Sequence, residues 1–311
     1  HRDHLLGGTL ADEKHQCVTQ SSRRRRMGVR SVQLGTPSFV EVTIMAARAK
    51  RGVRRLATTW VATARCLLPQ PKTGSFSPGE AQLWGRRHIA YLMVIFTDTL
   101  QTVTTPTTIR PMTLARVINE RHKATGTLAA IGHEIIADDT ASRLAGQAQR
   151  LLDEVGSVLL ATPGPSATAD SLVGPVRVTD HLRATLLAMV TIGLHDGIDI
   201  PSLAIIESCR TLSAVLDETH GGRTIELRIP PACAVQLAAT ESGPSHHRGT
   251  PPNVAETDPV TFLRLATGFS RWSEMRSAGR VQASGSHVDD AAGVLPVVDM
   301  AGIFRDILAD D

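Results

Sequence analysis

The residues best suited to bind a ligand lie in a polar stretch near the end of the chain, HHRGTPPNVAETDP, which begins at His246. Arg248, Thr250 and Asn253 could donate hydrogen bonds to a carboxylate or phosphate near the positive end of the helix expected to follow. The same stretch could instead form a shaped turn, because Gly249 permits a positive φ and the adjacent prolines stiffen the path. The residues are compatible with both interpretations.

Metal ligation is the next chemistry to consider. Five histidines fall in the expected helices, but no two of them stand four residues apart with a carboxylate between them, as in a zinc-protease helix. They are His88, His122, His133, His181 and His195. The four cysteines form no CxxC pair and have no histidine at metal-finger spacing. We therefore predict no metal site, no catalytic residue and no disulfide framework, and we expect a reducing, cytoplasmic location.

The beginning of the chain is strongly basic. Residues 1–65 hold 13 Lys and Arg against 4 Asp and Glu, whereas the remainder holds 20 against 26. The arginine run in SSRRRRMGVR could bind nucleic acid or an anionic membrane, or belong to a disordered tail without a partner. We expect a disordered tail over 1–44, no nucleic-acid partner, and a true start at Met27 or Met45.

Size and composition indicate a folded body of about two domains, at roughly 100–200 residues each. The 311 residues are 42% hydrophobic but only 3% aromatic, so the core must consist mainly of aliphatic side chains. No stretch approaches the ~18 uninterrupted apolar residues of a membrane span, and we predict none.

Apolar residues spaced three and four apart predict several helices between residues 46 and 220. Leu56, Trp60 and Ala64 form one such stripe, in a helix that should stop before Pro69. One helix is expected over 114–136 and a linker over 162–175. The expected boundary residues are Thr113 and Thr179 as caps, Pro201 as a first helical residue and Gly221 as a terminator. Together these helices predict an antiparallel bundle.

The sequence pattern changes after residue 220, from helical spacing to the alternation that is typical of strands. RTIELRI alternates as a half-buried strand does, CAVQLAA follows as a second strand, and RVQASG is a third. Asp258 and Pro259 start a helix that Gly268 closes, and Ser270 should cap another. We predict a small α+β layer, its sheet covered by these two helices. Its expected interior residues are Val235, Leu237, Phe262, Leu265, Trp272, Val281 and Leu295.

This order of elements, with DPVTFLRLATG, a tryptophan in the next helix and GRVQASG, resembles the sterol-carrier-protein-like domains of mycothiol-using actinobacteria. RIPPACAVQ and RGTPPNVAETDP match the same domain. More weakly, RPMTLARVI and GPVRVTDHLRATLLAMV resemble the helical bundle of the mycothiol-dependent maleylpyruvate isomerase family. The resemblance implies an isomerase-like bundle over 45–220 and a sterol-carrier-like domain over 221–300, followed by a tail over 301–311.

In the isomerase family, two histidines and one glutamate of the bundle ligate a divalent metal. The resemblance places those ligands at Leu92, Ala188 and Ile192 of this chain, none of which can bind a metal. Sliding the register brings His195 nearer, but Thr191 then stands where the glutamate should be. The resemblance therefore implies the fold and argues against the isomerase reaction.

Two main hypotheses follow. The first is a non-enzymatic carrier that needs no cofactor and holds an apolar small molecule. The residues expected to bind that molecule are Arg248, Thr250, Asn253, Phe262, Leu265 and Trp272, although the apolar ones would equally suit a filled core. The alternative is an enzyme, a transferase or isomerase that uses a divalent metal and mycothiol. A third hypothesis, nucleic-acid binding through residues 23–30, is the least favoured, and the sequence predicts no oligomeric state.

Overall fold

The computed structural model describes residues 39–68, 78–136, 141–161, 167–238 and 253–301. The chain divides into two units, residues 1–42 and residues 43–311, and the elements below belong to the second unit from residue 43 onward. The expected tail over 1–44 lies mostly outside the described residues, but its last residues are helical, since the first helix begins at Phe39. The expected tail over 301–311 lies outside the described residues after Ala301.

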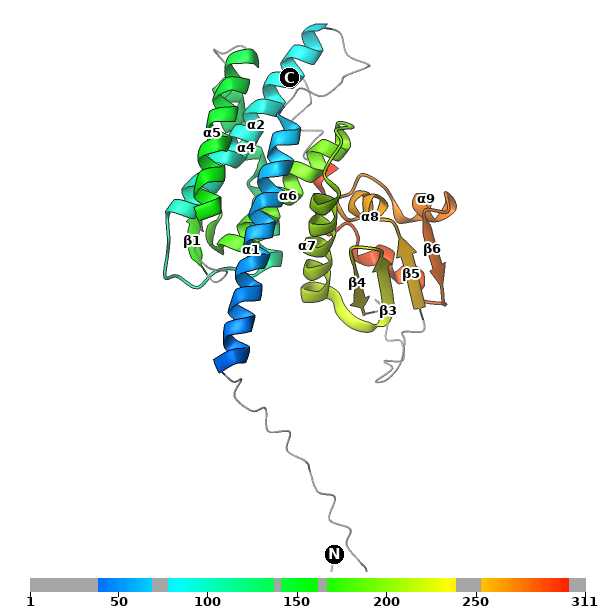
Figure 1. Cartoon of the computed structure of the whole chain (residues 1–311). Coiled ribbons are helices and arrows are strands. Elements are labelled where there is room, and N and C mark those ends of the chain that lie inside the picture. Colours follow the sequence, from blue (N-terminus) through cyan, green and yellow to red (C-terminus); the bar gives the residue numbers. More distant parts are fainter. Residues whose placement is uncertain (1–38, 69–77, 137–140, 162–166, 239–252, 302–311) are drawn as a thin grey trace, which may run out of the picture. The chain divides into compact units, whose positions relative to one another are not determined.

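The chain is mixed α+β, with helices first and a small sheet toward the end (Figure 1). The helices before the sheet are α1 (Phe39–Leu67), α2 (Pro78–Thr104), α3 (Leu114–Lys123), α4 (Thr125–Ile136), α5 (Ala141–Ala161), α6 (Val178–His195) and α7 (Ser202–His220). None of the helices in the described ranges has both the length and the apolar character that a membrane crossing requires.

Helix α6 lies at the centre of the helical region. Between Val178 and Gly193, all of its residues except Thr179 and Arg183 are buried, as expected for a helix that is apolar on every side. The predicted stripe of α1 faces the same core, where the Trp60 and Phe96 rings meet edge to face with centroids 5.7 Å apart. Aliphatic residues of α1, α2, α5 and α6 fill the remaining core.

The helix boundaries confirm some predicted caps and correct others. Thr113 caps α3 by accepting a hydrogen bond from the backbone of Arg116, and Gly221 follows α7, as predicted. The prediction that Thr179 caps α6 was wrong, because α6 begins at Val178 and Thr179 lies inside its first turn. Pro201 precedes the first helical residue of α7 rather than occupying it.

Two further predictions about the helical region were wrong. The helix expected over 114–136 is two helices, α3 and α4, separated at Ala124. The expected linker contains a hairpin of β1 (Thr168–Ser171) and β2 (Gly174–Arg177). Gly174, with a φ of +110°, supplies the turn conformation that glycine adopts most readily. The hairpin is short and half polar, which explains why its sequence resembles a loop.

The sheet has four strands in the order β4-β3-β5-β6, where three were predicted. They are β3 (Gly221–Ile229), β4 (Cys233–Leu237), β5 (Asn253–Thr257) and β6 (Val281–Ser284). The missed strand β5 pairs parallel to β3, inside the sheet. Ile225, Leu227 and Ile229 are buried as the alternation predicts.

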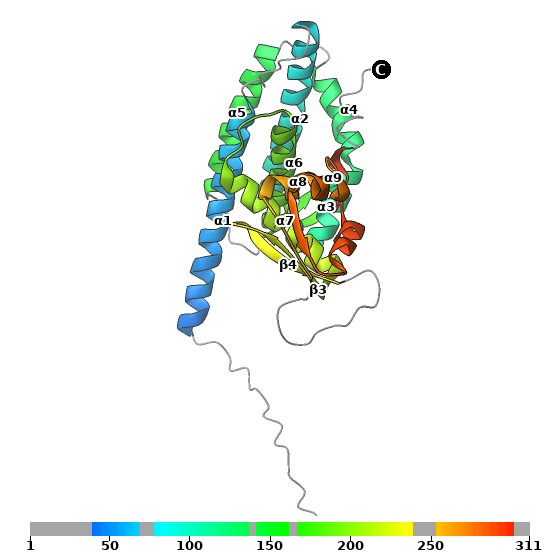
Figure 2. The same cartoon turned by 90° about the vertical axis from the view of Figure 1, so that its right-hand side faces the viewer.

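Three short helical elements complete this part: α8 (Pro259–Ala266), α9 (Trp272–Ser277) and a 3-10 helix, η1 (Val288–Val294). Asp258 caps α8, its carboxylate accepting a hydrogen bond from the Thr261 backbone nitrogen at 3.0 Å, as predicted. Ser270 is not the cap of α9, because Arg271 occupies that position. Helix α7 also packs against β4 and β3, so the predicted covering of the sheet by α8 and α9 was incomplete (Figure 2).

Candidate functional site

A pocket lies where α2, α3, α4 and α6 meet the segment 297–301, and we call it the α3–α6 pocket. The pocket is partly open, and its space together with the adjoining solvent amounts to about 400 Å³. Its apolar lining residues are Ile118, Leu128, Ala184, Leu187, Ala188, Val298 and Met300, and its polar ones are Tyr91, Arg121, His122 and Thr125.

The space in this pocket is available because some of its lining side chains are small. Ala184 and Ala188 are four residues apart on α6 and therefore share one face of the helix. Methyl groups at these positions leave room that a longer side chain would fill. Ala188 is also the position at which the resemblance placed one metal ligand of the isomerases.

The segment 297–301 closes one side of the pocket. It is held against the end of α8, because the backbone nitrogens of Val297 and Met300 donate to the carbonyls of Ala266 and Thr267 at 2.9 and 3.0 Å. These bonds fix Val298 and Met300, which line the pocket. The pocket is therefore built from both the helical region and the last described residues.

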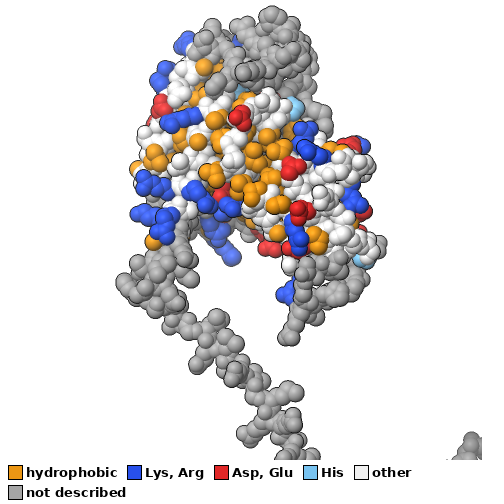
Figure 3. Space-filling view, turned by 45° about the vertical axis from the view of Figure 1, so that its right-hand side comes forward, with side chains coloured by type: hydrophobic (Ala, Val, Ile, Leu, Met, Phe, Trp, Pro, Cys, Tyr) orange, Lys and Arg blue, Asp and Glu red, His pale blue; other side chains and the backbone are white. Residues whose placement is uncertain are grey.

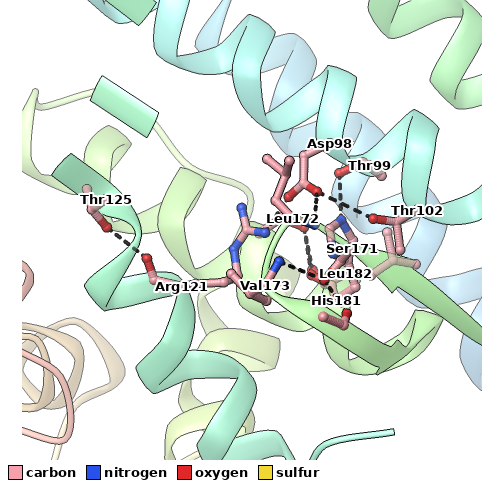
Figure 4. Close-up of polar contacts among 12 residues, drawn as sticks. Asp98, Thr99, Thr102, Arg121, Thr125, Ser171, Leu172, Val173, His181 and Leu182 are labelled. Atoms are coloured by element: carbon pink, nitrogen blue, oxygen red, sulfur yellow. Dashed lines mark hydrogen bonds and ion pairs between the residues drawn. The ribbon is translucent and has the colours of Figure 1, made fainter. Parts of the chain in front are cut away.

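A buried ion pair connects a lining residue of the pocket, Arg121, to Asp98 (Figure 4). Arg121 of α3 donates through Nη1 to Asp98 of α2, and the two side chains are 9% and 1% exposed. Asp98 also accepts hydrogen bonds from the backbone nitrogen of Leu172 at 3.3 Å and from the hydroxyl of Thr102 at 3.4 Å. Arg121 lines the pocket, so its orientation there is set by α2 and by the β1–β2 turn.

The surroundings of Asp98 favour its ionised form. Burial alone would raise the pKa of Asp98, but charges at His181 and Arg121 and hydrogen bonds from Arg121 and Leu172 outweigh burial, and the pKa is lowered. Burial lowers the pKa of His181 to about 4, against the opposing attraction of Asp98. His181 is thus neutral near pH 7, and Arg121 supplies the positive charge beside Asp98 at that pH.

His181 is enclosed by the same group. Its ring is fully buried, and Nε2 lies 3.1 Å from the hydroxyl of Thr99. Its Nδ1 is buried and has no hydrogen-bond partner within the described part of the chain. The neutral ring fits this site, because a charged imidazole would need a partner for each nitrogen.

Two of the three other polar residues of the pocket, Tyr91 and His122, can also donate hydrogen bonds. Burial raises the pKa of Tyr91, with Arg121 opposing it, so the phenol keeps its proton. Nδ1 of His122 is buried and finds no hydrogen-bond partner among the residues described. Thr125 uses its hydroxyl to donate to the carbonyl of Arg121 at 3.0 Å. The pocket thus combines apolar lining residues with three that can donate hydrogen bonds, Tyr91, Arg121 and His122, which we call the donor edge.

None of the predicted binding residues that the structure describes lines this pocket. Arg248 and Thr250 lie outside the described residues. Asn253 is 2% exposed, and its side chain donates to the Thr224 carbonyl at 3.0 Å and accepts from the His287 backbone nitrogen at 2.9 Å. These two bonds hold β5 to its neighbours in the fold.

The predicted apolar residues lie in the core around the sheet. Phe262, Leu265 and Trp272 are 0%, 2% and 8% exposed, and the indole of Trp272 donates to Asp289 at 2.8 Å. None of the three lines the α3–α6 pocket. Their expected role in ligand binding remains a prediction, whereas their expected burial is confirmed.

The residues that line the pocket were not predicted. Arg121 and His122 belong to NERHK, which resembles an exposed polar helix face, and nothing near them in sequence indicates Asp98 as a partner. The one signal in the sequence was the spacing of the apolar residues Leu114, Val117 and Ile118. That spacing puts Arg121 on the same buried face of the helix.

A second pocket lies between the end of α6 and α8, also with about 400 Å³ of space including the part open to solvent. His195, Arg264 and Phe269 line it, and the His195 and Phe269 rings have centroids 5.2 Å apart. Figure 3 shows apolar side chains across the middle of one face, with lysine and arginine around them. Apolar atoms form more than half of an ordinary protein surface, so this face alone identifies no site.

The described residues contain no cluster of three or more His, Cys, Asp and Glu side chains arranged to hold a metal ion. Leu92, Ala188 and Ile192, the positions where the resemblance placed ligands, are 0%, 7% and 3% exposed. A metal-free helical region stays a prediction.

These features define a mixed α+β protein with a helical region, a small sheet and a pocket formed by both. The family described as Bacterial SCP ortholog matches residues 203–297, which confirms the resemblance of the C-terminal part to that family. The match begins inside α7, which the sequence assigned to the bundle, and includes the whole sheet.

Two crystal structures show a weak likeness to this chain. One is the mycothiol-dependent maleylpyruvate isomerase and the other is a histidine-to-alanine mutant of it, with TM-scores of 0.38 and 0.39. Both are 12% identical to this chain, covering 77% of it and 92% of the matched chain. A likeness this weak carries no argument about this chain. No curated protein sequence matches this chain significantly.

Proposed function

We propose that this protein is a non-enzymatic carrier that holds an apolar small molecule in the α3–α6 pocket. The observation that carries the proposal is the pocket itself, in which Leu187, Val298 and Met300 surround the space left by the alanines of α6. The match of residues 203–297 to the family described as Bacterial SCP ortholog supports a carrier function in general, although none of the pocket-lining residues falls within that range. We also propose the finer arrangement expected from the sequence, an antiparallel bundle over 45–220 in a cytoplasmic protein.

Native mass spectrometry of freshly purified protein tests the proposal. We expect a retained small molecule, or uptake of 1-octanol as a probe, detected as added mass and as a higher melting temperature. Ala188→Phe should abolish both effects, because the ring fills the pocket. The control is Ala214→Phe, at an exposed position of α7, which should behave as the wild type. A wild-type protein that retains nothing and takes up no octanol would overturn the carrier proposal.

The residues predicted in the polar stretch and the sheet part offer a second location. If Arg248, Thr250, Asn253, Phe262, Leu265 and Trp272 bind the molecule instead, Ala188→Phe will leave binding intact. Trp272→Phe should then weaken binding, because it replaces the larger of the two aromatic side chains in that set.

The alternative function is a transferase or isomerase that uses a divalent metal and mycothiol. Only the place of the pocket favours it, because the pocket lies where the resemblance puts an isomerase ligand, although Ala188 itself cannot bind a metal ion. Elemental analysis of purified protein, combined with thermal stabilisation by zinc, separates the two functions. One zinc ion per chain would overturn the carrier proposal, and metal-free protein that binds octanol would support it.

A further inference from the structure

Three of the four polar residues that line the α3–α6 pocket are hydrogen-bond donors, while the fourth, Thr125, uses its hydroxyl hydrogen on the Arg121 carbonyl. Tyr91, Arg121 and His122 each carry a hydrogen on oxygen or nitrogen, and among the described residues no Asp or Glu lines the space. Apart from Thr125 the remaining lining residues are apolar, so the pocket suits a ligand that combines a hydrogen-bond acceptor with hydrocarbon.

Arg121 is the strongest of these donors. Its side chain is 9% exposed. Among the described residues, the guanidinium donates a hydrogen bond to Asp98 through Nη1. A guanidinium has five N–H groups in a planar fork and can bind a second carboxylate edge to edge. Asp98 orients that fork without competing for space, because Asp98 is not among the lining residues.

Tyr91 and His122 extend the donor edge. The hydroxyl of Tyr91 keeps its proton, since burial raises the pKa of that group. His122 lines the pocket and has a buried Nδ1 with no hydrogen-bond partner within the described ranges. A buried nitrogen without a partner costs free energy that a bound ligand could recover by reorienting the ring.

We propose that the ligand of this carrier is an amphipathic monocarboxylate, whose head group binds Tyr91, Arg121 and His122 while its hydrocarbon lies against Leu187, Ala188 and Met300. This inference rests on the proposed carrier function. A monoanion suits the site better than a phosphate dianion, because Arg121 already shares its charge with Asp98 and more negative charge would remain uncompensated. A cationic head group is disfavoured, because it would face Arg121 and no acidic residue among the described lining residues.

Three probes with the same eight-carbon chain test the head group: octanoate, 1-octanol and octylamine. In calorimetric titrations at pH 7.5 and constant salt, we expect octanoate to bind about tenfold more tightly than octanol, since charge-assisted hydrogen bonds are the stronger ones. Octylamine should bind most weakly. Equal affinities for octanoate and octanol, or a preference for octylamine, would overturn the head-group inference and leave the carrier proposal intact. Binding of none of the three would overturn both.

Variants of the donor edge locate the head group. Tyr91→Phe removes one hydroxyl, and we expect it to weaken octanoate binding by about tenfold and octanol binding by less. Equal losses for both probes would contradict a role for Tyr91 in binding the carboxylate. Because Arg121→Gln alone leaves Asp98 without its partner and could unfold the protein, the second variant is the pair Asp98→Asn with Arg121→Gln. It should abolish the preference for octanoate over octanol, and a preference that persists would overturn the assignment.

Discussion

Asp98 and Arg121 form an ion pair in which both side chains are removed from solvent, at 1% and 9% exposure. The same carboxylate accepts a hydrogen bond from the backbone of Leu172, in the turn between β1 and β2. One acidic group therefore joins α2, α3 and the hairpin beside the pocket. A buried charge is tolerated only when it is paired and hydrogen-bonded, so each of these contacts depends on the others.

Removing one member of this pair should destabilise the protein strongly. Arg121→Met leaves Asp98 charged and unpaired, and we expect the free energy of unfolding to fall by about 3–5 kcal/mol. The double variant Asp98→Leu with Arg121→Met should lose much less than the sum of the two single variants, because it buries no charge. Urea unfolding followed by circular dichroism measures all four proteins. A single variant within about 0.5 kcal/mol of the wild type would contradict the prediction.

Buried His181 should make stability depend on pH. Its pKa is lowered from 6.5 to about 4 in the folded protein, so between these values the unfolded chain binds a proton that the folded chain does not. The free energy of unfolding should therefore fall by roughly 3 kcal/mol as the pH drops from 6.5 to 4. The pKa of Asp98 is also lowered in the folded state, so its contribution is lost at still lower pH, below 3.8.

His181→Gln isolates the histidine contribution. The variant lacks the titrating ring, so its stability should change less than that of the wild type between pH 7 and pH 4.5. His220→Gln, which replaces an exposed histidine of α7, is the control and should keep the wild-type dependence. Identical pH profiles for wild type and His181→Gln would show that the ring does not titrate as described.

Local sequence patterns predicted the helices and strands whose own residues show apolar periodicity or include a helix-capping residue. The stripe of Leu56 and Trp60 predicted α1, and Asp258 followed by proline predicted α8, because each signal lies within a few residues. Strand β5 was missed because NVAET has little apolar alternation, and its place in the sheet comes from pairing with β3 about thirty residues earlier.

The pocket was beyond prediction for the same physical reason. Tyr91, Arg121 and Met300 come from three distant parts of the sequence, and only tertiary packing brings them together. A buried arginine is unusual unless it is paired, and its partner Asp98 lies one helix earlier. Residue types and short spacings therefore cannot predict this ion pair, whereas they can predict a helix cap, whose residues are neighbours in the sequence.

Asn253 should prove to be a structural residue. Its side chain already makes two buried hydrogen bonds, to Thr224 and from His287. Asn253→Ala leaves both partners unsatisfied, so we expect a loss of about 1–3 kcal/mol in the free energy of unfolding, with the affinity for octanol unchanged. Gln282→Ala, at an exposed position of neighbouring β6, is the control and should be near neutral. Loss of ligand binding at unchanged stability would instead support the role predicted from the sequence.

The hydrogen bond between Trp60 and Thr185 should contribute measurably to the docking of α1 on α6. The indole Nε1 donates to the Thr185 hydroxyl at 2.8 Å, and both residues are fully buried. Thr185→Val keeps the shape but leaves the indole N–H unpaired, and we expect it to cost about 1–3 kcal/mol. Thr185→Ser keeps the hydroxyl and loses a methyl group, so we expect a smaller cost, about 1 kcal/mol. Thermal and urea unfolding measure both variants. A valine variant as stable as the wild type would mean that this bond contributes nothing net, because packing alone would then hold α1 against α6.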